Sequence, residues 1–285
     1  MHGRRGSRSA CLLEFPARPV SRSRSHPVRL LSRAAESRHG QTPPRRRILR
    51  ILFLGASALH RKYGEVEQAL HEQLASAGHR NVRIFNVTTP GHTSRDSWLK
   101  YAALAEARFD LVIFYHGIND TTANNAPPEI FRGDYAHYSW YEVVNVLASY
   151  HRATSFALPY TLRYVFIRTR QTLAKDRYLP TGRPRNDWVH YGAEPRSALA
   201  FRQNLKAILD LAARRGDRVL LMTFATYVPT DYSEEAFHGR RLDYGLHRVP
   251  LEAWGRREHV VKAVAAHNEV VRTLASQHDN VLFVD

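Results

Sequence analysis

Five short apolar runs between residues 48 and 285 constrain the fold more than any other feature of the sequence. Each run is continuous or nearly so, whereas a strand with one face in water would alternate apolar and polar residues. Unbroken runs of this length are typical of strands buried on both faces of a parallel sheet. They predict five strands, near residues 50–54, 82–87, 110–115, 218–223 and 280–284.

Segments with helical spacing separate these runs. Apolar residues recur at helical intervals over 66–77, 201–212 and 260–274, and Gly78 and Gly216 mark the ends of the first and second of these helices. With right-handed crossovers, this alternation predicts a doubly wound α/β fold in three layers, α/β/α. We expect a parallel sheet with strand order 2-1-3-4-5, in which the first and third strands are neighbours.

Residues 121–200 interrupt the alternation of strands and helices. This stretch is rich in Tyr, Trp and Phe, with scattered Pro and Arg. So long a connection in a compact sheet usually has a function or a small fold of its own. It is interpreted either as a cap over the carboxyl ends of the strands, where open α/β sheets bind ligands, or as packing elaboration without substrate contact.

The positive charge of the chain is concentrated at its beginning. The formal net charge is +16, and residues 1–50 hold 13 Arg and only two acidic residues, so they account for +11 and the remainder for +5. Residues 1–47 are also rich in Ser and Pro and have no apolar period, which predicts a disordered basic leader before a domain at 48–285. Such a leader is compatible with a transit peptide, a phosphate-binding arm, or an unstructured or wrongly translated stretch without a role.

Composition limits the other classes of function. The +5 charge of the folded part argues against specific nucleic-acid binding as the main activity. No apolar run approaches the length of a transmembrane helix, and no signal-peptide core precedes Ile48. The single cysteine, Cys11, lies in the leader, so the predicted domain has neither a disulfide nor a thiolate metal site, and the compartment stays undetermined.

A serine follows the first predicted strand, in Gly55-Ala56-Ser57. We expect a helix to begin there, so that free backbone N–H groups and the helix dipole would favour negative charge beside Ser57. That setting suits a nucleophile whose own N–H helps to hold an oxyanion. A simple N-cap role for Ser57 is the alternative.

Polar, glycine-containing loops follow the second and third predicted strands. They contain Gly91, and the sequence Gly117-Ile118-Asn119-Asp120, and would face the same crevice as Ser57. The N–H of Gly91 and the side-chain amide of Asn119 are the donor types of an oxyanion hole. The alternatives are a positive φ at Gly91 and a turn that Asn119 stabilises through its own backbone.

Together these three blocks resemble those of the SGNH (GDSL-type) serine hydrolases over about residues 48–285. The resemblance implies Ser57 as the catalytic nucleophile, and the Ser57 N–H, the Gly91 N–H and the Asn119 amide as oxyanion donors, with no metal or organic cofactor. An α/β-hydrolase elbow fits less well, because G-x-S-x-G would need glycine where Leu59 stands. The acidic residue that commonly precedes the family's serine is replaced by Ala56.

The family's D-x-x-H block, which supplies the general base and its orienting carboxylate, is expected after the fifth strand and hence beyond Asp285. The 285-residue chain is therefore expected to be an incomplete domain and inactive or nearly so. Asp134-Tyr135-Ala136-His137 has the same spacing but lies inside the insertion and is interpreted as a chance match. His92 and His116 lie near the crevice and are not expected to be the base.

The leading interpretation is a serine esterase, lipase-like enzyme or carbohydrate O-acyl esterase or acyltransferase that acts on a small-molecule or glycan acyl ester. The alternative is a catalytically dead protein of the same fold that binds a glycan or another polymer. A D-x-x-H downstream of Asp285 in the reading frame would favour the enzyme. The acyl group, the acceptor and the oligomeric state are not determined by the sequence.

Overall fold

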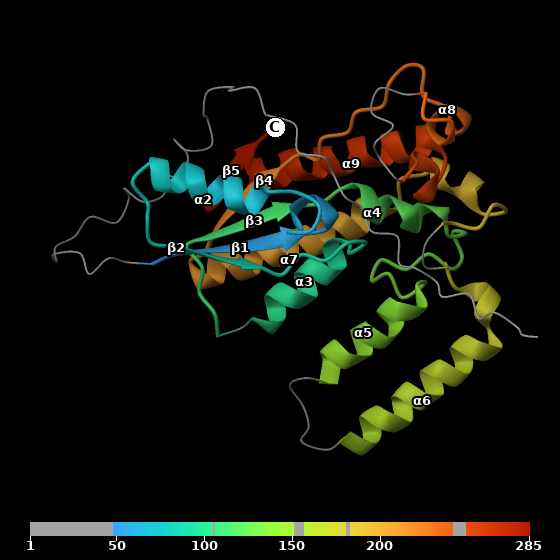
Figure 1. Ribbon diagram of the computed structural model, residues 1–285. Coiled ribbons are helices and arrows are strands. Elements are labelled where there is room, and N and C mark those ends of the chain that lie inside the picture. Colours follow the sequence, from blue (N-terminus) through green and yellow to red (C-terminus); the bar gives the residue numbers. More distant parts are fainter. Residues whose placement is uncertain (1–47, 105, 151–156, 181–182, 242–248) are drawn as a thin grey trace, which may run out of the picture.

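The computed structural model describes residues 48–104, 106–150, 157–180, 183–241 and 249–285. The predicted disorder of the leader at 1–47 lies outside the described residues. The sheet has five parallel strands in the order β2-β1-β3-β4-β5, which confirms the predicted topology (Figure 1). The strands are β1 (Leu49–Gly55), β2 (Val82–Asn86), β3 (Leu111–Tyr115), β4 (Arg218–Met222) and β5 (Val281–Val284).

Helices cover both faces of the sheet, as predicted. One core contains the side chains of β1 and β3 that face α3 (Ser94–Ala103), α7 (Ser197–Arg215) and α9 (Arg257–Ser276). The other core lies on the opposite face, where Ile51, Phe53 and Ile113 pack with Leu74 of α2 (Val66–Ser76). The successive side chains of a strand point to opposite faces, so the unbroken apolar runs supply both cores.

The predicted helix ends are present. Gly78 and Gly216 adopt positive φ values of 90° and 71°, the left-handed conformation that commonly ends a helix. At the start of α3, the Thr93 side chain accepts from the Arg95 N–H, and Asp96 accepts from the Thr93 N–H at 2.8 Å. This reciprocal cap fixes the place where the chain turns from the loop after β2 into α3.

The register brings the loops that follow β1, β2 and β3 to one edge of the sheet. Gly55 pairs with Tyr115 of β3, and Phe53 pairs with Asn86 of β2. The side-chain amide of Asn86 also donates to the Leu59 carbonyl at 2.9 Å, which ties the turn after β1 to the end of β2. Parallel strands share their carboxyl edge, so these loops form one surface.

Residues 121–200 contain α5 (Ser139–Tyr150) and α6 (Ala157–Leu173), which form a hairpin that extends away from the sheet (Figure 1). The Tyr141 hydroxyl contacts Asp96 and Thr93, and Asn145 accepts from the Arg95 guanidinium at 2.8 and 3.0 Å. The insertion is thus attached to the start of α3. A cap role over bound substrate stays a prediction.

Three short elements complete the edge around this region: α4 (Ile118–Thr121), the 3-10 turn at Thr122–Asn125 and the 3-10 turn at Val189–Ala193. The half-buried Arg196 joins the two 3-10 turns, because its Nη2 donates to the carbonyls of Asn124, Ala126 and Tyr191 at 2.9 to 3.1 Å. A further helix, α8 (Glu234–His238), precedes α9. Within the described ranges, no helix has both the length and the apolar composition to cross a membrane.

Replacing the guanidinium of Arg196 should destabilise the fold. In Arg196→Met three backbone carbonyls lose a charged donor, and we expect the free energy of unfolding to fall by about 2 to 3 kcal/mol in urea titration. The matched control is Arg214→Met, at an exposed position of α7, which should change it by less than about 0.5 kcal/mol. Equal stability of the two variants would show that the three carbonyls need no charged donor.

Candidate active site

Ser57 lies directly beyond β1 and is half-buried. It begins a single 3-10 turn, Ser57–Leu59, and the long helix α2 starts only at Val66. The predicted helix at Ser57 was therefore wrong: a turn around His60–Gly64 intervenes, and the dipole of α2 does not act at the serine. One part of the prediction still holds: Ser57 is the first residue of a 3-10 turn, and the first residue of such a turn leaves its own N–H unbonded within the turn.

Gly91 lies in the exposed turn between β2 and α3 with a φ of 78°. An added Cβ would meet nothing within 4 Å, so space does not require glycine there, but the left-handed backbone favours it. The positive φ is the simpler of the two roles weighed for this residue. It is also compatible with the other role, because it leaves the Gly91 N–H free of a side chain.

Asn119 bridges two loops. Its Nδ2 donates to the His92 carbonyl at 2.9 Å, and its Oδ1 accepts from the indole Nε1 of Trp254 at 2.9 Å. An indole N–H can only donate, so the Trp254 bond identifies which end of the amide carries the oxygen. The side chain of Asn119 thus does not bond its own backbone turn, and its second amide hydrogen is available.

Three unused donors therefore belong to the loops at this edge of the sheet. In the described part of the chain, neither the Ser57 N–H nor the Gly91 N–H donates a hydrogen bond, and Asn119 has one amide hydrogen left. Backbone and amide N–H groups held in place before a reaction are the means by which proteins stabilise an oxyanion.

The loop that carries Asn119 is supported from α9. The buried His267 contacts the Gly117 carbonyl through Nδ1 at 3.0 Å and the Ser197 hydroxyl through Nε2 at 2.8 Å. A carbonyl only accepts, so Nδ1 carries the proton. Gly117 also has no room for a side chain, because an added Cβ would lie 2.5 Å from the Cβ of Phe224. The loop geometry thus depends on a close approach that only glycine allows.

Asp120 is fully buried beneath the same loop. It accepts from the Ser94 N–H and hydroxyl, the latter at 2.6 Å, and from the Tyr135 hydroxyl at 2.8 Å. Burial raises the pKa of Asp120 to about 6, although the bonds from Ser94 and Tyr135 oppose that rise. The carboxyl group joins the loop after β3, the start of α3 and the insertion.

The histidines that sequence analysis set aside as bases have structural surroundings. His116 is buried and bonded to the Ser97 hydroxyl at 2.7 Å, and burial lowers its pKa to about 3. His137 accepts from the Arg132 N–H at 3.0 Å and is stacked on Phe131, and burial lowers its pKa also to about 3. The Asp134–His137 spacing thus belongs to a packed histidine of the insertion.

His92 is the histidine closest in sequence to the unused donors. Its carbonyl accepts from Asn119, and its Nδ1 lies 3.6 Å from the Asp96 carboxylate, too far for a hydrogen bond. Burial lowers the pKa of His92, with the Asp96 charge opposing the shift. Across the described ranges, no side chain, His92 included, makes a hydrogen bond to Ser57 Oγ.

Comparison with solved structures finds several chains of low sequence identity that this chain resembles. The chain resembles an SGNH-hydrolase family esterase, AlinE4, with 17% identity over 84% of this chain and 76% of that one, at a TM-score of 0.40. It also resembles a lipase/acylhydrolase from Enterococcus faecalis (16% identity, 84% and 76% coverage, TM-score 0.36) and an acetyl xylan esterase from Geobacillus stearothermophilus (16%, 83% and 76%, TM-score 0.39). No family profile and no curated protein sequence matches the chain.

Two contributors to this site were not predicted from the sequence. Trp254 lies far along the chain, in a stretch without a strand or helix signal, and only the three-dimensional structure places its indole on Asn119. His267 occupies a buried position of a helix with ordinary apolar spacing. A histidine at such a position was the available signal, although it does not indicate the partner.

The buried titratable groups predict a loss of stability in acid. His116, His137 and His267 have pKa values of about 3, 3 and 4, below the usual 6.5, so the unfolded chain binds their protons first as the pH falls. Asp120 changes the stability in the opposite direction, because its folded-state pKa of about 6 lies above the usual 3.8 and the folded chain binds this proton first. At about pH 5 the unfolded state holds roughly two more protons, and we expect the free energy of unfolding to fall by about 3 kcal/mol per pH unit.

Urea titrations at several pH values measure this slope. His267→Gln should reduce it by about one proton, roughly 1.4 kcal/mol per pH unit, because glutamine does not titrate. His238→Gln, at an exposed position, is the control and should leave the slope unchanged. A stability that is flat through this range would contradict the assigned neutral histidines.

Proposed function

We propose that this protein acts on acyl esters through Ser57, with the N–H groups of Ser57 and Gly91 and the side-chain amide of Asn119 as the oxyanion hole. The observation that carries the proposal is the state of Asn119. Its amide is oriented by Trp254 and by the His92 carbonyl, and it retains one unused hydrogen, while the N–H groups of Ser57 and Gly91 in the neighbouring loops are unbonded in the described part of the chain. An orientation fixed in advance by other bonds is what electrostatic stabilisation of a transition state requires.

The chemistry follows from these groups. Ser57 Oγ attacks the ester carbonyl carbon, the carbonyl oxygen becomes an oxyanion that accepts from the three donors, and the Oγ proton passes to a base. Collapse of the intermediate expels the alcohol and leaves an acyl group on Ser57. Water then releases the acid, or another hydroxyl accepts the acyl group.

Removal of the Ser57 Oγ proton is the step for which the described residues supply no base. In the part of the chain that the structure describes, Ser57 Oγ has no hydrogen-bond partner, so the serine is a neutral alcohol that transfers its proton to solvent. Members of a catalytic triad act as a unit, and loss of the base costs several orders of magnitude in rate. We therefore propose that this chain acylates slowly, with an activated ester as the first detectable substrate.

The substrate class is proposed to be a small-molecule or glycan acyl ester. Aromatic side chains of the insertion support this choice, because rings such as Trp140 of α5, 55% exposed, are free to stack on sugar faces. The alternative is a protein that binds the same polymer without chemistry. Acylation of the serine separates the two functions.

We expect p-nitrophenyl acetate to leave an acetyl group on Ser57. Mass spectrometry of the digested chain should find the adduct on the Ser57 peptide, and Ser57→Ala should abolish it. Asn119→Ala should slow its appearance by roughly a hundredfold, the usual effect of losing one oxyanion donor. Ser76→Ala, at an exposed serine of α2, is the matched control and should acylate normally.

Two outcomes would contradict this assignment. An adduct that forms equally in Asn119→Ala would remove the side-chain amide from the oxyanion hole. A complete lack of adduct in a folded chain, together with retained binding of an acylated glycan, would indicate the binding protein instead.

Trp254 should act as a positioning residue for Asn119. Trp254→Phe keeps an aromatic ring and removes the N–H that Asn119 Oδ1 accepts, so the amide is free to flip. We expect the maximal rate of Ser57 acylation to fall roughly tenfold, with the ester concentration at half-maximal rate nearly unchanged. Tyr164→Phe, at an exposed ring of α6, is the control. A purely structural role would appear instead as lost stability with the rate of the folded fraction unchanged.

A further inference from the structure

The α6 helix presents its apolar side chains to solvent. Leu158, Leu162, Val165, Phe166 and Leu173 have exposed fractions of 60, 63, 54, 64 and 83%, and we call them the α6 outer face. Their spacing of four, three, one and seven residues places all five on one side of the helix. Ile167 and Gln171, which are buried, lie on the opposite side.

The inward side of α6 is attached by polar contacts. Gln171 donates to the Ser139 carbonyl at 2.8 Å and to Glu142 at 3.0 Å, and Arg170 pairs with Glu142. The helix is therefore fixed to α5 by a few bonds on one side. Its outer face is left without a partner in the described part of the chain, and Figure 1 shows α6 at the outer edge of the molecule.

Positive charge flanks this apolar face on both sides. At 100° per residue, Arg163 and Arg170, the latter paired with Glu142, fall on one flank of the α6 outer face and Arg168 on the other. The helix sequence Ala157–Leu173 contains no acidic residue. An apolar stripe between two cationic borders is the arrangement of helices that lie in the interface of an anionic bilayer.

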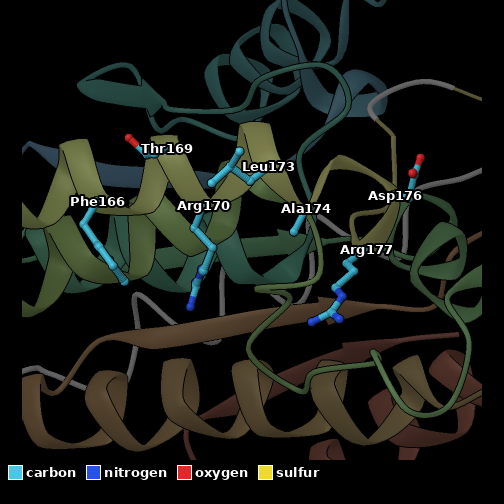
Figure 2. A pocket seen from close by; sticks show the side chains of 7 residues that line it. All are labelled: Phe166, Thr169, Arg170, Leu173, Ala174, Asp176 and Arg177. Atoms are coloured by element: carbon cyan, nitrogen blue, oxygen red, sulfur yellow. The ribbon is translucent and has the colours of Figure 1, made fainter.

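A cavity at the end of the helix is lined by the same kinds of side chain, apolar and cationic. It has a volume of about 550 Å³, and its lining, drawn in Figure 2, includes Phe166 and Leu173 of the α6 outer face together with Arg170 and Arg177. Asp176 is the one acidic side chain of the lining. Neither Ser57, Gly91 nor Asn119 contributes to this cavity, so it is separate from the candidate active site.

We propose that the α6 outer face docks onto a lipid surface that carries anionic phospholipids. The five apolar side chains would enter the acyl boundary, while Arg168 and Arg177 would contact headgroup phosphates. The charge of the face favours an anionic lipid over the chain's own leader as the partner that covers it. Residues 1–50 carry a net charge of +11 and would be repelled by the same arginines. The proposal is independent of the chemistry at Ser57.

Sedimentation of the full chain with vesicles tests this docking. The vesicles contain phosphatidylcholine with or without phosphatidylglycerol, and we expect binding only when the anionic lipid is present. The arginine-rich leader also attracts anionic vesicles, so binding is measured at raised salt, where electrostatic attraction is screened and apolar contact persists.

Matched variants separate the face from the leader. Leu162→Glu combined with Phe166→Glu should weaken binding at raised salt by at least about tenfold, because it places two charges in the apolar stripe. Leu199→Glu, at a leucine of α7 that is 65% exposed, is the control and should bind like the parent chain. Both substituted positions on α6 are exposed, so thermal unfolding should show an unchanged fold.

A label placed on the face reports its environment. Leu162→Cys in a Cys11→Ser background, coupled to an environment-sensitive fluorophore, should shift to shorter wavelength on mixed vesicles and stay unshifted on phosphatidylcholine alone. Binding that Leu162→Glu with Phe166→Glu leaves unchanged would overturn the proposal. Equal binding to neutral and anionic vesicles would also overturn it. So would a chain that binds neither kind of vesicle but forms a dimer that the two substitutions dissociate.

Discussion

The candidate site depends on the buried carboxyl group of Asp120. It accepts from the start of α3 through Ser94, and from the insertion through Tyr135, while its backbone belongs to the loop after β3. Burying a carboxyl group is costly, and the raised pKa of Asp120 expresses that cost. The donors offset it only in one arrangement of the three segments, so the group that is most expensive to bury also specifies their positions. Asn119 is adjacent to Asp120 in the sequence, so its position depends on the same arrangement.

Strands and their order were accessible from the sequence because one physical signal determines both. A run such as 111–115 is apolar on every residue, and only a strand covered on both faces needs that. Helical covers on both sides and right-handed crossovers then leave few possible orders. The glycines after α2 and α7 were readable for a similar reason, since a left-handed residue ends a helix at little cost only when it lacks a Cβ.

The site was less accessible, because its determinants are contacts between segments distant in sequence. Ser57 has the same neighbours in the sequence whether a long helix or a single turn follows, and the tertiary tie from Asn86 to the Leu59 carbonyl belongs to the turn that forms. Likewise nothing near Trp254 indicates Asn119, which lies 135 residues away in the chain. The α6 helix escaped prediction for another reason: its apolar period faces outward, whereas sequence reasoning assigns such a period to the core.

The proposed oxyanion hole and the proton transfer from Ser57 place different demands on the chain. Donors for an oxyanion need only backbone N–H groups and one oriented amide, which the carboxyl edge of a parallel sheet supplies as a consequence of its loops. A base needs a titratable side chain whose pKa lies near neutrality, and the buried histidines here are held far below it by desolvation. The same burial that makes His267 a dependable support for Gly117 disqualifies it as a proton acceptor. Support and proton transfer therefore require different histidines, one desolvated and one open to solvent, and in the described residues only the first kind contacts the loop of Asn119 through its ring.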